Sequence, residues 1–233
     1  MQDNDLVSCL CVTRDRVPML RRAIACFLSQ TYVPRELVIV YESDDSATRD
    51  FLAALHEPTI RAVEVPAHPK LPLGRLRNLS LEAARGRYVA QWDDDDWYGP
   101  QRLAAQIAAV RDSGKDGCVL IRWLMYDEAT GTAYLSHLRA WEGSLVAVRN
   151  AIPPYPEQAK GEDTPVVTAM LNEGRLTGLD RPRLYVYVYH GTNTWEREHW
   201  ETRLASFSQP LSVEQAEFVR QRLYGPVGQW DKQ

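Results

Sequence analysis

The chain has 233 residues, of which 45% are hydrophobic and 25% are charged, and its formal net charge is −4. These values are typical of a globular protein with a sizeable core, and the mild acidic balance argues against nucleic-acid binding, which uses a basic patch or stripe. No stretch has the about 20 consecutive apolar residues of a transmembrane helix, and the polar, acidic first residues predict no signal peptide.

The first half of the chain predicts alternating strands and helices. A near-continuous apolar run at 6–13 predicts a strand buried on both faces, and further strands are expected at 36–41, also buried, at 60–65, where the pattern is weaker, and at 88–92. Apolar residues at helical spacing predict helices that begin near Pro18, Ser46, Leu73 and Pro100. Gly86 is expected to end the third of them. This alternation predicts a parallel sheet with helices on both faces. Ligands of such sheets bind beyond the carboxyl ends of the strands, here after Thr13, Tyr41 and Trp92.

The second half predicts a different mixture of elements. A strand is expected at 117–125, a turn into another strand at 127–132, an extended segment at 145–148 and a helix at 164–171. A strand at 184–189 would place Leu184, Val186 and Val188 on one face and three tyrosines on the other. Residues from about Trp195 onward are expected to be helical and partly exposed. No linker interrupts the pattern, so we expect one domain over residues 1–233.

The four cysteines predict reduced, buried thiols. Cys9, Cys11, Cys26 and Cys118 form no C-x-x-C pair, and three of them lie in apolar runs. Such usage indicates a reducing compartment. We therefore expect a cytoplasmic protein, with a peripheral position at the inner face of the membrane as the alternative.

Residues 93–96 are four consecutive aspartates between a buried strand and a helix. Adjacent carboxylates repel one another, and a hard divalent cation such as Mg²⁺ or Mn²⁺ neutralises them well. The alternative is a solvated acidic loop. An EF-hand is excluded because, counted from Asp93, the sixth residue is Tyr98 rather than Gly and the twelfth is Ala104 rather than Glu.

Several motifs occur together in one order along residues 5–110. They are Arg77-Asn78, then Ala84-Arg85-Gly86-Arg87-Tyr88, then Trp92 with the aspartates 93–96, and then Pro100. This order resembles the donor-site half of family 2 glycosyltransferases of the GT-A fold. Val7-Ser8, the stretch Thr13-Arg14-Asp15-Arg16, Gln30-Thr31-Tyr32 and residues 37–40 also look like that family.

The resemblance implies a GT-A fold, an α/β architecture with a mixed, mainly parallel sheet flanked by helices. Residues of about 5–115 would bind the nucleotide sugar, 116–195 the acceptor, and 196–233 would form a helical tail. The implied reaction moves a sugar, with inversion, from a nucleoside-diphosphate sugar, UDP-sugars being favoured, to a glycan, lipid-linked or other hydroxyl acceptor. Mn²⁺ or Mg²⁺ would assist departure of the diphosphate as a Lewis acid. The partners would be donor and acceptor, and a homo-oligomer stays open.

The resemblance also implies a site for the nucleobase. The loop after the first strand would cradle the base with Val12, Thr13 and Arg14, where the family usually has Pro in place of Val12 and Tyr in place of Arg14. Glu42 takes the position of an Asp that contacts uracil in the family. The alternative for Glu42 is an exposed strand end.

The diphosphate and the metal would lie next to the aspartates. In the resemblance, Asp95 binds the metal, and Asp93 and Asp94 contact ribose or metal-bound water. Arg75 or Arg77 would steady the base or the diphosphate, since guanidinium pairs well with phosphate oxygens. The alternative for both arginines is a solvated helix face.

The resemblance places the catalytic base in the second half. Inverting transfer needs a carboxylate that accepts the acceptor proton, and Asp163 in Gly161-Glu162-Asp163-Thr164 fits, with Glu162 contacting the acceptor. The alternative is that these carboxylates cap a helix. His190 would complete the metal shell, or else be a satisfied core histidine.

Two other functions stay open. A sugar-nucleotide nucleotidyltransferase usually has a glycine-rich basic loop after the first strand, and residues 13–18 contain no glycine. A non-catalytic module that binds nucleotide sugars or carbohydrates would keep the acidic cluster but would not need Asp163.

Overall fold

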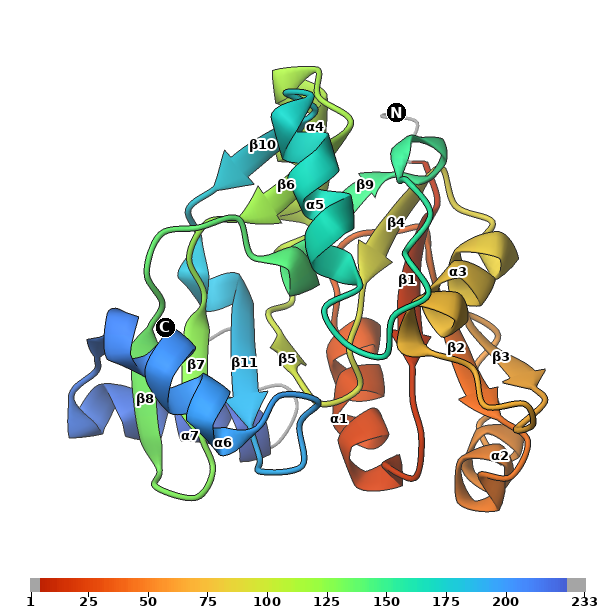
Figure 1. The fold of residues 1–233 in the computed structure, drawn as a ribbon, viewed down its shortest axis with the longest axis horizontal. Coiled ribbons are helices and arrows are strands. Elements are labelled where there is room, and N and C mark those ends of the chain that lie inside the picture. Colours follow the sequence, from red (N-terminus) through yellow and green to blue (C-terminus); the bar gives the residue numbers. More distant parts are fainter. Residues whose placement is uncertain (1–4, 226–233) are drawn as a thin grey trace.

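The computed structural model describes residues 5–225 and contains two sheets (Figure 1). The larger sheet has seven strands. They are β1 (Val7–Val12), β2 (Arg35–Glu42), β3 (Ile60–Val65), β4 (Tyr88–Gln91), β6 (Gly117–Leu120), β9 (Val146–Val148) and β10 (Leu176–Leu179). Their order is β10-β6-β9-β4-β1-β2-β3, and only β9 runs against its neighbours. The predicted mixed, mainly parallel sheet is confirmed.

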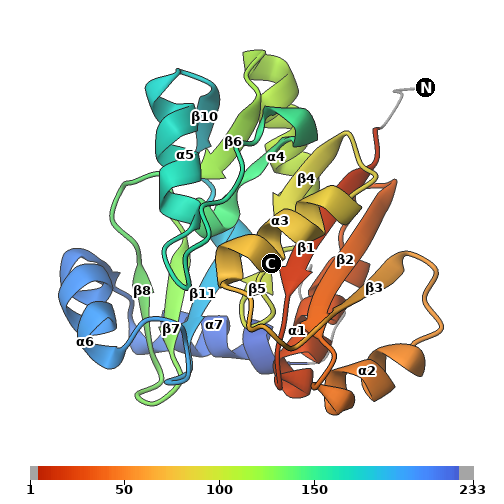
Figure 2. The same cartoon turned by 45° about the vertical axis from the view of Figure 1, so that its right-hand side comes forward.

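Helices cover both faces of this sheet. They are α1 (Val17–Leu28), α2 (Ser46–Ala53), α3 (Leu73–Ala83), α4 (Arg102–Ser113) and α5 (Asp163–Asn172). Since successive residues of a strand point to opposite faces, Cys9 packs in the same cluster as residues of α1 and α4, whereas Leu10 packs with the end of α3. Val119 of β6 packs against α5. Figure 2 shows α3 in front of the large sheet.

The smaller sheet contains five strands in the order β12-β8-β7-β11-β5. They are β5 (Trp97–Tyr98), β7 (Leu124–Asp127), β8 (Thr132–Leu135), β11 (Tyr185–Tyr189) and β12 (Gln209–Pro210). The helix α7 (Val213–Tyr224) contacts β7 and β8. The short helix α6 (Arg197–His199) leads into a π-helical turn at Trp200–Leu204, and the Trp200 ring stacks on Tyr189 with ring centroids 5.0 Å apart.

The expected strand at 117–125 is wrong, because the chain changes sheets within it. Residues 117–120 form β6 in the larger sheet and residues 124–127 form β7 in the smaller one. The segment from β10 to β11 makes the same crossing beside it, since β6 pairs with β10 and β7 pairs with β11, both in parallel. At the crossing, Arg122 donates two hydrogen bonds to Asp180, at 2.9 and 2.5 Å.

One expected helix start is confirmed and one expected helix end is wrong. The helix α2 begins at Ser46, and Asp45 is its N-cap because the Asp45 side chain accepts a hydrogen bond from the Thr48 amide at 3.0 Å. Gly86 does not end α3, which ends at Ala83 with Ala84 as its C-cap. A Cβ on Gly86 would lie 2.6 Å from the carbonyl oxygen of Leu6. Glycine is therefore required there for the close approach of two backbone segments.

The remaining predictions concern the cysteines and the end of the chain. All four cysteines are buried and free. The expected helical tail at 196–233 is mostly helical as far as residue 225, apart from the short strand β12, and its last residues, 226–233, lie outside the described part. No helix between residues 5 and 225 is long and apolar enough to cross a membrane.

Candidate active site

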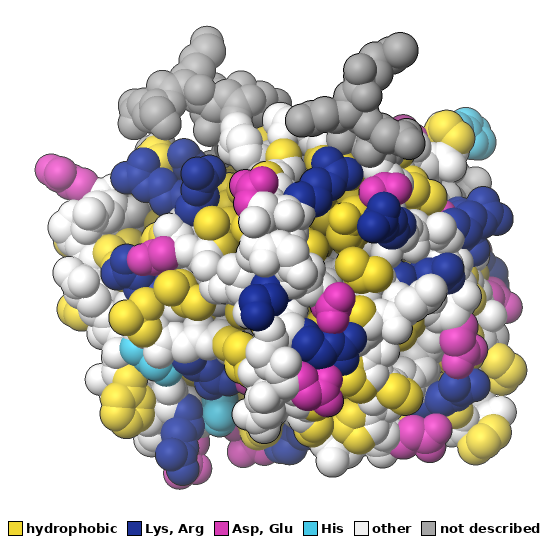
Figure 3. All heavy atoms as spheres, turned by 90° about the horizontal axis from the view of Figure 1, so that it is seen from above, with side chains coloured by type: hydrophobic (Ala, Val, Ile, Leu, Met, Phe, Trp, Pro, Cys, Tyr) yellow, Lys and Arg dark blue, Asp and Glu magenta, His cyan; other side chains and the backbone are white. Residues whose placement is uncertain are grey.

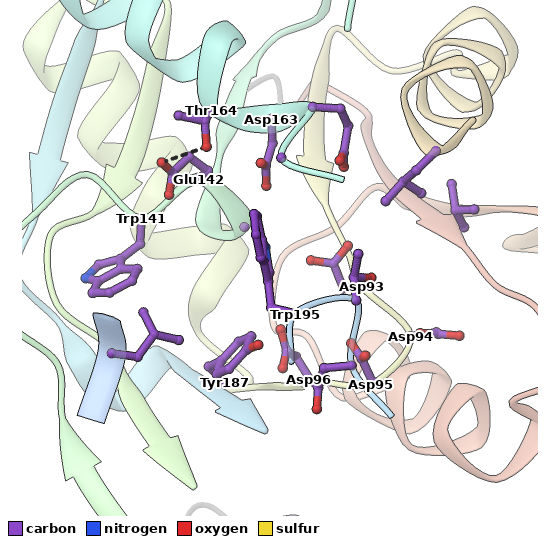
Figure 4. Close-up of a pocket in the computed structure, with 18 of the residues that line it drawn as sticks. Asp93, Asp94, Asp95, Asp96, Trp141, Glu142, Asp163, Thr164, Tyr187 and Trp195 are labelled. Atoms are coloured by element: carbon purple, nitrogen blue, oxygen red, sulfur yellow. Dashed lines mark hydrogen bonds between the residues drawn. The ribbon is translucent and has the colours of Figure 1, made fainter. Parts of the chain in front are cut away.

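A pocket with a volume of about 270 Å³ lies beyond the carboxyl ends of β1 and β4, where ligands of such sheets bind. Its walls come from distant parts of the sequence: the end of β1, the aspartates after β4, the start of α5, and β11 with the loop that follows it. In Figure 4, Asp163 points into the pocket from one side and residues 93–96 lie on the other, with the Trp195 ring between them.

The four aspartates divide into two pairs. Asp94 is only 4% exposed and accepts a hydrogen bond from the Thr13 hydroxyl at 2.6 Å. Asp96 is 2% exposed and accepts from the Tyr185 hydroxyl at 2.5 Å and from the Val188 amide at 2.9 Å. The side chains of Asp93 and Asp95 are 25% and 15% exposed. Alternate carboxylates therefore remain accessible to a ligand.

Burial makes two of these carboxyls hard to ionise. It raises the pKa of Asp94 to about 7, with help from the charge of Asp95. Burial likewise raises the pKa of Asp96 well above its ordinary value. Burial also opposes ionisation of Asp95, but a hydrogen bond with His190 and the charge of Arg16 outweigh it and lower its pKa. The pKa of Asp95 is therefore held below those of its neighbours Asp94 and Asp96.

His190 meets the acidic cluster as the resemblance implied. Its Nε2 lies 3.0 Å from Oδ2 of Asp95, while its Nδ1 faces the amide and hydroxyl of Thr192 at 3.3 and 2.9 Å. The Thr192 amide can only donate, so Nδ1 is the acceptor and Nε2 carries the hydrogen toward Asp95. Arg16, to which the sequence assigned no role, approaches the same Asp95 oxygen at 3.0 Å. In the sequence, the position of Arg16 in the loop after the first strand was the feature that could have indicated this contact.

Asp163 is the first residue of α5 and lies, partly buried, beside a chain of charges. Burial raises its pKa to about 6, although the nearby Arg77 lowers it. Arg77 donates to Glu162 at 2.5 Å and to Asp93 at 2.9 Å, and it therefore joins the two sides of the pocket. Glu162 is the N-cap residue of α5, but its side chain makes no capping hydrogen bond. The capping alternative therefore does not explain it.

Gln91 is a second link that the sequence analysis missed. Its side-chain amide lies 3.3 Å from Asp93 and 3.4 Å from Asp163, so one buried group faces both carboxylates. In the sequence, the sign of such a contact was a polar residue inside the apolar run at 88–92, because a buried polar side chain usually has a hydrogen-bond partner.

The residues expected to hold the nucleobase meet at the ends of β1 and β2. Glu42 is 2% exposed, so the alternative of an exposed strand end is wrong. Its Oε2 accepts hydrogen bonds from Arg14 and Lys70, whereas its Oε1 is buried and has no hydrogen-bond partner among the described residues. Arg14 also forms an ion pair with Asp44 at 2.8 Å.

Of the remaining expected residues, one reaches the pocket and one does not. Val12 lines the pocket. Arg75 pairs with Glu82 on the outer face of α3 at 3.0 Å and does not line the pocket, which agrees with the solvated-face alternative.

Two tryptophans also line the pocket. Trp123 and Trp141 stack on each other with centroids 4.4 Å apart and are 5% and 2% exposed, so most of the surface of both side chains is packed in the core.

Comparisons of sequence give consistent matches. The family model described as Glycosyl transferase family 2 matches residues 8–169. The chain is 36% identical over 93 residues, 40% of its length, to the succinoglycan biosynthesis protein ExoO of Rhizobium meliloti, and covers 26% of that relative. It is 32% identical over 115 residues, 46% of its length, to the putative colanic acid biosynthesis glycosyl transferase WcaA of Escherichia coli, and covers 39% of it. The chain thus spans less than half of each of these relatives.

Comparisons of structure give the same fold. TarS of S. aureus in complex with UDP-GlcNAc matches with a TM-score of 0.63 and 15% identity, over 80% of this chain and 59% of that one. The mannosyltransferase PcManGT of Pyrobaculum calidifontis, in complex with GDP-Man and Mn²⁺, matches with a TM-score of 0.60 and 15% identity, over 83% and 59%. Since the family model extends from β1 into the helix that begins with Asp163, the chain belongs to glycosyl transferase family 2, and it has the GT-A fold.

Proposed function

We propose that this chain moves a sugar, with inversion, from a UDP-sugar to a hydroxyl of a glycan or lipid-linked acceptor in polysaccharide biosynthesis. One observation carries the proposal. Asp163 lies across a single pocket from Asp93 and Asp95, and Gln91 lies between Asp163 and Asp93. A donor diphosphate beside Asp95 would thus leave room for an acceptor hydroxyl beside Asp163. The names of the relatives, and the UDP-GlcNAc complex of TarS, support the choice of substrates.

The nucleobase would lie against the ends of β1 and β2. In this proposal Val12, Thr13 and Arg14 shape the base site. The Oε1 of Glu42, which is buried and has no partner among the described residues, would accept the N–H of the base. A buried acceptor without a partner is costly, so a ligand that supplies a donor is stabilised there.

The residues present fit a divalent cation only together with a donor. Among residues 5–225, no group of three or more potential ligands is arranged to hold a metal. Oδ2 of Asp95 and Nε2 of His190 lie 3.0 Å apart, and once Nε2 gives up its hydrogen the two atoms would hold Mn²⁺ or Mg²⁺ jointly with diphosphate oxygens, which hard cations prefer. The cation would supply Lewis-acid stabilisation of the departing diphosphate. Two side chains of the protein, Arg16 and Arg77, also place positive charge beside Asp95 and Asp93.

Asp163 would act as the general base. Its carboxylate accepts the proton of the acceptor hydroxyl while the oxygen attacks the anomeric carbon from the face opposite the leaving diphosphate. A pKa of about 6 leaves most of the group ionised at neutral pH and makes it more basic than an ordinary aspartate. Glu162, held by Arg77, would contact the acceptor and orient the loop.

Thermal shift with a panel of nucleoside diphosphates, with and without Mn²⁺, tests the donor site, because a ligand that binds the native state raises its melting temperature. We expect a rise with UDP that requires Mn²⁺. The rise should be lost in Asp95→Ala and kept in Asp112→Ala, which removes a carboxylate from the exposed side of α4.

Sugar transfer, with the anomeric configuration of the product read by NMR, tests catalysis. Asp163→Asn should lower the transfer rate by about 10²–10⁴-fold, the usual contribution of a general base, and leave the UDP-induced shift in place. If Asp163→Asn transferred sugar at the wild-type rate, another base would be at work. Pyrophosphate release from a nucleoside triphosphate and a sugar phosphate would instead indicate the nucleotidyltransferase, and donor binding without any transfer would indicate the binding module.

A further inference from the structure

The side of the pocket away from the aspartates carries positive charge. His199, at the end of α6, lines the pocket there. Burial lowers the pKa of its ring, and the charged side chains that lower it further are all cations: Arg203, Arg139 and Lys160. Lys160 lies in the loop before α5, Arg139 in the segment after β8 and Arg203 in the π-helical turn, so the fold brings together cations from three separate segments.

Most of this positive charge is not neutralised within the protein. Arg139 forms an ion pair with Glu142. Lys160 and Arg203 are both exposed, and neither forms an ion pair with a described residue. The cations beside the aspartates differ, because Arg16 and Arg77 both pair with carboxylates. On the face of the molecule seen from above, Lys and Arg side chains are interspersed with Asp and Glu (Figure 3).

An aromatic surface lies within the same group of cations. The Trp195 ring stacks on the His199 ring with centroids 4.3 Å apart and an interplanar angle of 19°. The Nζ atom of Lys160 lies 4.9 Å from the centroid of the Trp195 ring. Trp195 is 37% exposed and stands in the middle of the pocket (Figure 4). A ring with accessible surface, flanked by cations, can take a sugar and an anionic substituent together.

Trp195 also connects this group to the candidate base. A Cβ placed on Gly161, which has φ +71°, would lie 3.6 Å from Cζ2 of the indole, so Trp195 packs over the backbone two residues before Asp163. A sugar ring that packs against the exposed part of Trp195 therefore lies next to Asp163. Its anionic substituent would point to Lys160 and away from the carboxylates, which would otherwise repel it.

We propose that Trp195, His199, Lys160, Arg139 and Arg203 form an acceptor subsite for an acidic saccharide, a sugar that carries a carboxylate or a phosphate group. The sugar ring packs against the exposed part of Trp195 that His199 and Lys160 leave accessible, and the anion contacts Lys160 and Arg203. This inference rests on the proposed glycosyltransferase reaction, for which it names the class of acceptor. The anionic group takes no part in bond formation, and a hydroxyl of the same ring faces Asp163.

Binding of matched saccharides tests the subsite. Trigalacturonate would be compared with its methyl ester, and a mannose phosphate ester with free mannose, by calorimetry in the presence of UDP and Mn²⁺ so that phosphate cannot bind at the donor site. We expect the acidic member of at least one pair to bind about fivefold or more tightly than the neutral one, a difference that shrinks at high salt. Which pair shows it distinguishes a carboxylate from a phosphate.

Variants link that difference to the named residues. Lys160→Gln/Arg203→Gln removes two exposed cations, so it should remove most of the preference and keep the UDP-induced thermal shift. The matched control is Arg49→Gln/Lys115→Gln, which removes one arginine and one lysine from α2 and the end of α4 and should keep the preference. Asp95→Ala should lose the UDP response and still bind the acidic saccharide, so failure of the donor site and failure of the subsite give different results.

Equal affinities within both pairs, or no binding of either acidic probe, would overturn the proposal. So would an acid preference that survives the double variant. A separate charge reversal, Lys160→Glu, should make the neutral member of the pair bind as well as the acidic one or better.

Discussion

Four consecutive aspartates occupy two environments, and this division matters for chemistry at the residue scale. Asp94 and Asp96 are satisfied by Thr13 and Tyr185, so they fix the loop to β1 and β11. Asp93 and Asp95 keep accessible oxygen atoms. The resemblance assigned the metal to Asp95 and the donor to Asp93 and Asp94, but the sequence did not predict that Asp94 and Asp96 are buried, because the partners that bury them lie 81 and 89 residues away.

The pH dependence of transfer should follow the carboxyl of Asp163. Its pKa is raised from 3.8 to about 6, so the group is protonated, and cannot act as a base, at pH values below about 6. We expect kcat to fall about tenfold per pH unit below that value. Measured kcat profiles should show this acidic limb in the wild type and lose it in the residual activity of Asp163→Asn.

Asp94 also has a raised pKa, about 7, so it needs its own control. Asp94→Asn should keep the acidic limb near pH 6. A limb that disappeared in Asp94→Asn, and remained in Asp163→Asn, would reassign the titrating group.

At the scale of elements, the sequence predicted best where one pattern matched one element. The strand expected at 60–65 is β3 to the residue, and the apolar residues at helical spacing in α4, which are Leu103, Ile107 and Val110, are buried. The short strands β5, β10 and β12 were missed because they have two to four residues, too few for any periodicity. The crossing within 117–127 was missed because only Arg122 interrupts the apolar run at the change of sheet.

The junction between α3 and β4 depends on Gly86. A Cβ there would meet backbone oxygens of Leu6 and Tyr88, both at 2.6 Å, and these atoms cannot shift without disturbing the pairing of β1 with β4. We expect Gly86→Ala to lower the free energy of unfolding by about 3 kcal/mol or more, the upper part of the range for overpacking. Urea denaturation measures it.

Gly114→Ala is the matched control for Gly86→Ala. Gly114 is the C-cap of α4 with φ +65°, and nothing lies within 4 Å of an added Cβ. Alanine there meets only backbone strain, about 1–2 kcal/mol. Equal losses at the two positions would mean that the backbone around Gly86 relaxes freely.

At the scale of the molecule, one core connects the two sheets. A single cluster of buried side chains contains Val7 and Cys9 of the larger sheet, Ile107 of α4, and Val186 of the smaller sheet. We therefore propose that residues 5–225 unfold as one domain, in one cooperative transition. The predicted donor and acceptor halves would then differ in what they bind but would unfold together.

Two probes can report the two sheets separately. The cysteines lie in β1, α1 and β6, and burial raises the pKa of Cys9 to about 12, so thiol labelling reports opening of the larger sheet. Most buried indoles, Trp97, Trp123 and Trp200, lie in or beside the smaller sheet. We expect labelling and tryptophan fluorescence to change at the same urea concentration. Separate midpoints would mean that the two sheets are independent domains.

The paired crossing between the sheets has a mechanical consequence. A single connecting segment would let the two sheets rotate about it. Here two segments cross side by side in the same direction, and Arg122 of one segment pairs with Asp180 of the other. Two such crossings joined by an ion pair restrict rotation between the sheets, so the pocket wall formed by Tyr185 and Tyr187 of β11 keeps its position relative to the aspartates of residues 93–96.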